Sequence, residues 1–176
     1  ASDVYKRQTH VPRYVQDKGL ADWTGMAILA LIGFFNIIGT LVMGYLGDKY
    51  SKKILLSGLY FLRGITLILF IFLPASNLSA VLFGTSFGLL WLATVPATNG
   101  IVAQIFGTKN LSLLFGIVFL NHQFGSFLGA YLGGYFYDQF GSFDYAWYLA
   151  IVLSFIATAL HLPIDEKPLA TVDKTI

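Results

Sequence analysis

Residues 44–53 read GYLGDKYSKK, which places one aspartate and three lysines in a short segment that also contains two glycines. Residues 23–47, which run into it, contain no Asp, Glu, Lys or Arg, and neither do residues 64–108, 110–137 and 145–164. A helix needs about 20 mostly apolar residues to cross the hydrocarbon core of a bilayer. We therefore expect this charged segment to be a loop between two membrane-spanning helices.

The composition agrees with this expectation. Charged residues make up 11% of the chain and hydrophobic residues 56%, whereas a soluble domain carries about 25% charged residues. The stretch 64–108 is too long for one span and is interrupted by Pro74 and the turn-forming residues after it. Membrane β-strands would alternate apolar and polar residues, and these runs are continuous. The sequence predicts an all-α transmembrane bundle over residues 23–164, with five spans at 23–47, 54–73, 79–106, 110–137 and 145–163.

The lysines predict the orientation of the bundle. Cytoplasmic loops carry an excess of Lys and Arg. One end is expected to hold six lysines and the other only Arg13 and Lys18; the six are Lys49, Lys52, Lys53, Lys109, Lys167 and Lys174. We expect the 44–53 loop and the tail 165–176 to be cytoplasmic and residues 10–22, 74–79 and 138–144 to face outward.

The first 22 residues differ from the rest of the chain, because they contain no long apolar run. Residues 1–8 resemble translated adapter sequence and are left out of the topology, although an ordinary polar loop is the alternative. Residues 9–22 are expected to be the outer end of a truncated helix followed by an extracellular loop. The chain has no cysteine, which excludes a disulfide and a cysteine-based metal site.

The loop at 44–53 resembles the glycine–aspartate–basic loop of the major facilitator superfamily, a pattern close to G-x-x-x-D-[RK]-x-G-[RK]-[RK]. The matching residues are Gly44, Asp48, Lys49, Lys52 and Lys53, and Ser51 stands where the second glycine is usual. An aspartate at a helix C-terminus is unfavourable unless it is paired, so Asp48 is expected to have a partner. The alternative is a plain positively charged loop.

Further segments resemble bacterial transporters related to the monocarboxylate porters. These are ATVP at 93–96, VAQIFG at 102–107, LFGIVFLNHQFGS at 114–126 and GGYFYD at 133–138. The resemblance implies that the five spans are helices eight to twelve of a twelve-helix transporter, that is, five complete helices of a six-helix half. Membrane lipid and a missing N-terminal six-helix half would then be its partners. The porters carry an aspartate–arginine pair on helix eight, whereas residues 31–43 here have no charge.

Polar residues at membrane depth are the site candidates. Arg63 lies ten residues after Lys53, or about 15 Å along a helix. A lone arginine there costs about 2.5–3.5 kcal/mol on insertion scales, so it either binds an anionic substrate or is a structural arginine bonded to carbonyls or to an acidic residue. His122 lies deep in its span and either carries a coupling proton or hydrogen-bonds a neighbouring helix. Asn121, next to His122, belongs to the same candidate cluster. Asn36, Asn99 and Gln104 are weaker candidates for lining a pore, and His161 is expected near the cytoplasmic interface.

Small residues predict helix contacts. Gly125, Gly129 and Gly133 repeat every fourth residue, which puts them on one helix face where two backbones can approach closely. Pro96 is a candidate weak point of the 79–106 span because proline removes a helical hydrogen bond.

Two kinds of function are compatible with a helical membrane protein of this composition. The first is a secondary transporter that moves a small solute by alternating access around a site at the membrane midplane. The alternative is a membrane-embedded enzyme or assembly factor, which should gather several acidic or histidine side chains within the membrane. Only His122 lies at such depth, and H-E-x-x-H, G-x-S-x-G and Walker-type motifs do not occur. The sequence favours a transporter of a small solute, with an organic anion or monocarboxylate as the candidate, and with no cofactor, metal, catalytic residue or nucleic-acid partner.

Overall fold

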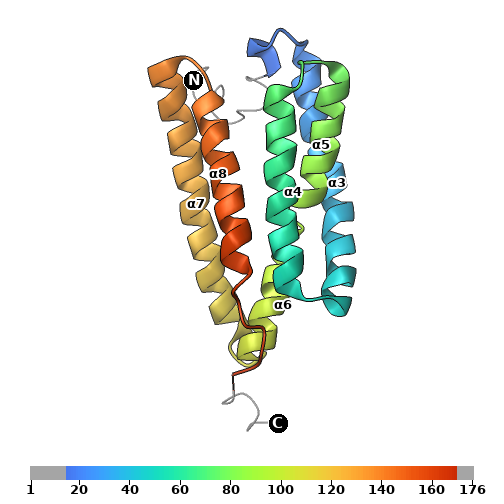
Figure 1. Cartoon of the computed structure of the whole chain (residues 1–176), viewed down its shortest axis with the longest axis vertical. Helices are drawn as coiled ribbons and strands as arrows, with labels where there is room; N and C mark the ends of the chain where they lie inside the picture. The colour runs from blue at the N-terminus through green and yellow to red at the C-terminus, as the bar shows by residue number, and fades with distance from the viewer. Residues whose placement is uncertain (1–14, 170–176) are drawn as a thin grey trace.

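The computed structural model describes residues 15–169, and this part of the chain is helical throughout its regular structure. Its helices are α3 (Asp22–Lys49), α4 (Lys52–Phe72), α5 (Asn77–Trp91), α6 (Thr94–Phe106), α7 (Leu111–Phe140) and α8 (Asp144–His161). They run up and down in an elongated bundle (Figure 1). Five stretches are long and apolar enough to cross a membrane, with α5 and α6 together forming one of them. The predicted all-α bundle of five spans is confirmed.

The predicted span 79–106 consists of two helices separated at Leu92 and Ala93. Pro96 explains the position of this break, because a proline cannot donate to the carbonyl four residues earlier and its ring clashes with that carbonyl, here that of Leu92. The amide of Val95 donates to the Leu92 carbonyl instead, at 3.0 Å. At the other end of α5, Ser76 and Ser79 form a reciprocal capping box that starts the helix.

Helices α3 and α5 approach each other closely through glycines. A methyl group placed on Gly39 would lie 2.1 Å from the backbone oxygen of Leu89, and one on Gly88 would lie 2.8 Å from that of Ile32. Gly84 precedes Gly88 by four residues and faces α3 in the same way. The α3–α5 contact is therefore a small-residue contact in which backbones touch.

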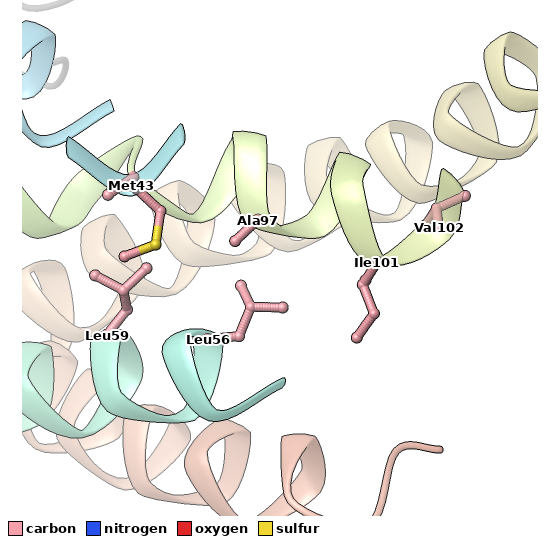
Figure 2. Close-up of a cluster of buried hydrophobic side chains, with 7 residues drawn as sticks. Met43, Leu56, Leu59, Ala97, Ile101 and Val102 are labelled. Carbon is pink, nitrogen blue, oxygen red and sulfur yellow. The ribbon is translucent and has the colours of Figure 1, made fainter. Parts of the chain in front are cut away.

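Two apolar clusters hold the bundle, one on each side of the break. Towards the N-terminal end of α5, Ile28 of α3, Leu67 of α4 and Phe83 of α5 belong to one cluster. Beyond the break, α6 packs against α3 and α4 in the other. Figure 2 shows Leu56 and Leu59 of α4 facing α6 and Met43 of α3; the buried members are Met43, Leu56, Leu59, Ala93, Ala97, Ile101 and Val102. The two half-helices thus belong to separate cores.

Helix α7 has little packing of its own. It contacts α6 and α8, and Gly133 is its only buried residue. A methyl group on Gly125 or Gly129 would meet nothing within 4 Å in the described chain. Their predicted role as a helix-packing face stays a prediction; Gly129 lines a pocket between α7 and α8.

Only Tyr50 and Ser51 join α3 to α4, because residues 44–49 belong to α3 and residues 52–53 to α4, so the loop is shorter than the predicted 44–53. Tyr50 and Ser51 have φ values of −125° and −57°, so a serine fits where the family pattern has glycine. Lys49 donates to the hydroxyl of Tyr45. Asp48 is exposed, and within the described residues it has no hydrogen-bonding or ion-pairing partner. The expected partner of Asp48 is not found in this part of the chain.

Residues 164–169 form a strap across the same end of the bundle, which we call the lysine-rich end (bottom of Figure 1). The carboxylate of Glu166 accepts the backbone amide of Lys53 in the first turn of α4, at 2.7 Å. The Lys53 ammonium donates to the Ile164 carbonyl at 2.8 Å, and the amide of Leu169 donates to the Ile105 carbonyl at 3.0 Å. The strap ties the end of α8 to both α4 and α6.

Candidate functional site

A cavity lies where α4, the α5–α6 break, α7 and α8 face one another. Its volume is about 660 Å³, and its lining consists of Tyr60, Arg63, Phe87, Trp91, Leu92, Thr94, Val95, Thr98, Phe115, Val118, Phe119, His122, Gly125, Ser126, Leu153 and His161. The two leading candidates from the sequence, Arg63 and His122, are both in this lining. Arg63 is its one Asp, Glu, Lys or Arg side chain, so the described wall of the cavity is positively charged.

Arg63 reaches from α4 to the C-terminal end of α5. One terminal nitrogen, Nη2, donates to the carbonyl of Leu90 at 2.7 Å and to that of Trp91 at 2.8 Å. In an uninterrupted helix the amide of Val95 would donate to Trp91, but here it donates to Leu92. The guanidinium therefore bonds a carbonyl that has lost its helical amide donor, at the negative end of the α5 dipole. The Thr94 hydroxyl also donates to this carbonyl, at 3.3 Å.

The rest of the Arg63 side chain lies among aromatic groups. The guanidinium carbon is 5.1 Å from the ring centroid of Tyr60, one helical turn earlier on α4, which is within the range of a cation–π contact. The Nε atom is buried without a hydrogen-bond partner. Carbonyl dipoles and a ring stabilise the charge, and no carboxylate of the described residues neutralises it.

Asn36 lies on the opposite side of the break, on α3. Its Oδ1 accepts the backbone amide of Leu92 at 3.0 Å. At the ends of α3, α4, α6 and α7, the corresponding cap amide donates to the carbonyl four residues earlier. At the end of α5 the side chain of Asn36 takes that place. Asn36 was expected to line a pore, and the structure places it behind the cavity wall.

His122 stacks on Phe119 of its own helix, with ring centroids 5.9 Å apart. His161 lies at the end of α8, where its Nδ1 is 2.7 Å from the Ala157 carbonyl and its ring stacks on Tyr60 at 5.0 Å. The sequence placed His161 near the interface, and the structure adds that it lines the cavity. Arg63, Tyr60 and His161 thus form one continuous series of stacked groups along the α4–α8 contact.

The remaining candidates lie outside the cavity. Asn121 is exposed and donates to the carbonyl of Ile117 on its own helix at 2.9 Å, and Asn99 is half-buried in α6. Gln104 lies at the lysine-rich end, where it accepts from Lys52 at 2.9 Å and donates to the Glu166 carbonyl at 3.0 Å. Within residues 15–169 no three His, Asp or Glu side chains gather in a way that could hold a metal ion.

The aromatic part of the site was not predicted from the sequence. Tyr60, Phe87, Trp91, Phe115 and Phe119 supply much of the lining. A signal was present on α7, since residues 115, 119, 122 and 126 are spaced by four, three and four and therefore share one helix face. That spacing identifies a face but not the cavity in front of it.

Comparison with known proteins supplies the family. Residues 10–175 match the family model described as Major Facilitator Superfamily. The chain belongs to this superfamily. It is also 30% identical over 164 residues to a Bacillus subtilis protein called "Uncharacterized MFS-type transporter YcxA". It is 27% identical over 143 residues to "Monocarboxylate transporter 13" of Rattus norvegicus, and 26% identical over 171 residues to "Monocarboxylate transporter 12" of Xenopus laevis.

The alignments cover most of this chain but a minor part of each relative. The matches to YcxA and to the two monocarboxylate transporters span 90%, 80% and 90% of the chain, and 39%, 33% and 36% of the respective relatives. The chain therefore spans between a third and two fifths of the length of these relatives. As a superfamily member with five membrane-length stretches, it is an integral membrane protein of a transporter family, and this favours the transporter over the enzyme or assembly factor.

Proposed function

We propose that this chain is the C-terminal part of a secondary transporter that moves a small organic anion, such as a monocarboxylate, by alternating access. The observation that carries the proposal is the cavity with Arg63 as its only described charge. A cation at membrane depth that is held by dipoles and not by a carboxylate keeps its net positive charge, and that charge attracts an anion from water. The aromatic lining is suited to the apolar body of such a molecule.

The shape of the described bundle supports a partner half. In alternating access the site lies between two helix bundles, and each supplies one wall. Residues 121–130 of α7, beside the cavity, are all exposed, and large side chains such as Phe124 and Phe127 are among them. We propose that a six-helix half covers this segment of α7 in the complete transporter. The lysine-rich end and the C-terminus are proposed to face the cytoplasm of a bacterial inner membrane, because lysines concentrate there.

The test is uptake by the complete transporter that carries this chain, reconstituted in liposomes with and without a proton gradient. Radiolabelled pyruvate, lactate and benzoate are suitable probes because each combines one carboxylate with a different apolar body. Arg63→Ala is expected to abolish uptake, and Arg63→Lys to impair it, because a single ammonium cannot hold both carbonyls and also present a separate N–H group to an anion, as the planar guanidinium can. Lys109→Ala, an exposed cation outside the cavity, is the matched control and should transport normally. If both Arg63 variants transport as the parent does, the anion site is not at Arg63.

A further inference from the structure

The α5–α6 break has two polar partners on opposite sides. Asn36 of α3 accepts the amide of Leu92 at 3.0 Å, while Arg63 of α4 donates to the carbonyls of Leu90 and Trp91 at 2.7 and 2.8 Å. The three backbone groups are consecutive in the chain. The two side chains therefore bind adjacent groups of the same short backbone segment. A change in the contact of Asn36 with this segment affects the contact of Arg63 with it.

Asn36 supplies the hydrogen-bond acceptor and Arg63 the donors that the backbone groups at the break require. An amide and a carbonyl that lose their helical partners inside a membrane must find others, because no bulk water is available there. An asparagine oxygen can accept from the amide, and a guanidinium can donate to two carbonyls at once. Pro96 prevents the alternative, a continuous helix, because it has no amide to donate to the Leu92 carbonyl.

We propose that Asn36 is a positioning residue for Arg63: together with Pro96 it holds the α5–α6 break open, so that two backbone carbonyls are available to fix the guanidinium in the cavity wall. Without the Asn36 acceptor, the amide of Leu92 donates to the carbonyl four residues earlier, and α5 can extend into the break, so that the amides of Thr94 and Val95 approach the carbonyls that an uninterrupted helix would give them. Backbone amides then compete for the carbonyls of Leu90 and Trp91, and Arg63 loses its fixed position. This inference rests on the proposed transport function, because a fixed guanidinium has a use only if the cavity receives an anion.

The proposed role also explains why α3 contacts α5 through a polar side chain, that of Asn36, which close packing of the two helices does not require. The α3–α5 contact is already close because of Gly39 and Gly88. On α3, Asn36 lies between Ile32 and Gly39, the residues that make these contacts. The exposed face of the same helix carries large apolar side chains such as Phe34 and Ile37. A polar side chain in this position is costly in a membrane unless it is satisfied, and the amide of Leu92 is the group that satisfies it.

The closing experiment measures the position of Arg63 directly, without a substrate. The complete transporter is treated in detergent with p-hydroxyphenylglyoxal, which modifies guanidinium groups, and the rate of modification of the peptide containing Arg63 is followed by mass spectrometry. Asn36→Leu and Pro96→Ala are each expected to raise this rate about tenfold, because a charge-assisted hydrogen bond that fixes the group is lost. Asn36→Asp keeps an oxygen acceptor at the same place and should stay within about twofold of the parent.

Two controls keep the outcome decisive. Asn99→Leu changes an asparagine of α6 for which the described structure offers no hydrogen bond, and it should leave the rate unchanged. Pro96→Ala favours a continuous helix, so it remains informative if Asn36→Leu fails to fold. An unchanged Arg63 modification rate in folded Asn36→Leu or Pro96→Ala protein would overturn the positioning role. If the parent takes up no carboxylate, the proposed function is wrong, whereas the Arg63 modification rates still decide whether Asn36 positions Arg63.

Discussion

Replacing Gly39 with alanine is predicted to destabilise the bundle more than any other glycine-to-alanine change on α3 or α5. The added methyl would lie 2.1 Å from the backbone oxygen of Leu89, whereas ordinary contact begins at 3.4 Å. The two helices must therefore separate locally by about 1.3 Å, which loses packing along their contact. Overpacking a well-packed core costs about 1–3 kcal/mol. We expect about 3 kcal/mol here because the clash is with backbone, which cannot move aside as a flexible side chain can.

The other glycines of α3 and α5 differ in how close an added methyl group would lie to its neighbours, so they predict a graded series of destabilisation. At Gly88 the nearest backbone oxygen is at 2.8 Å, and at Gly84 it is at 3.2 Å, whereas a methyl on Gly33 meets nothing within 4 Å. Gly33→Ala is the matched control, because it lies on α3 itself and gains the helix propensity of alanine, worth up to about 1 kcal/mol.

The assay is thermal unfolding of the four variants in detergent micelles, followed by tryptophan fluorescence. The midpoint is expected to fall most for Gly39→Ala, less for Gly88→Ala and least for Gly84→Ala, and to stay level or rise for Gly33→Ala. A Gly39→Ala protein that is as stable as Gly33→Ala would show that α3 and α5 do not meet backbone to backbone.

Three further predictions concern the ends of the bundle and the cavity. Glu166→Ala should lower the unfolding midpoint by the equivalent of about 0.5–2 kcal/mol, as loss of a helix cap does; Asp165→Ala, whose side chain is 70% exposed, should have no effect. If His122 carries the coupling proton, His122→Asn should retain uptake down an anion gradient and lose its stimulation by a proton gradient, and equal stimulation in both proteins would exclude that role. In the cysteine-free chain, a membrane-impermeant thiol reagent should label Tyr50→Cys only from the cytoplasmic side and Ala75→Cys only from outside; both positions are exposed loops, and the reverse pattern would invert the topology.

The spans were predictable because the bilayer imposes a simple rule. Long runs without charge must be helices, and short charged segments must be loops, so the positions of a few lysines and prolines define the bundle. The exact break inside 79–106 was not predicted, although Pro96 was recognised as a weak point. A proline acts on the carbonyl four residues before it, so the helix gives way at Leu92 and Ala93, ahead of the residue that causes it.

The membrane depth of the site residues could be predicted from the sequence, but their hydrogen-bond partners could not. Counting residues from loop lysines placed Arg63 and His122 well inside the membrane, and both line the cavity. Their substrate and proton roles stay predictions. The pairing of Asn36 with the amide of Leu92 joins residues 56 positions apart, and nothing in the local sequence marks it. The glycine spacing at 84 and 88 is the same as at 125 and 129, yet only the first pair meets a helix in the described chain, because spacing identifies a face and not its neighbour.

Arg63 also shows why the structural and the functional role of a buried charge need not be alternatives. A broken helix inside a membrane is unfavourable because its free carbonyls lack donors, and an arginine at that depth is unfavourable because it lacks acceptors. Brought together at Leu90 and Trp91, each supplies what the other lacks. The carbonyl dipoles stabilise the cation without cancelling its charge, as a carboxylate would. An arginine that is held in this way is rigid and still positive, and these are the two properties that an anion site requires.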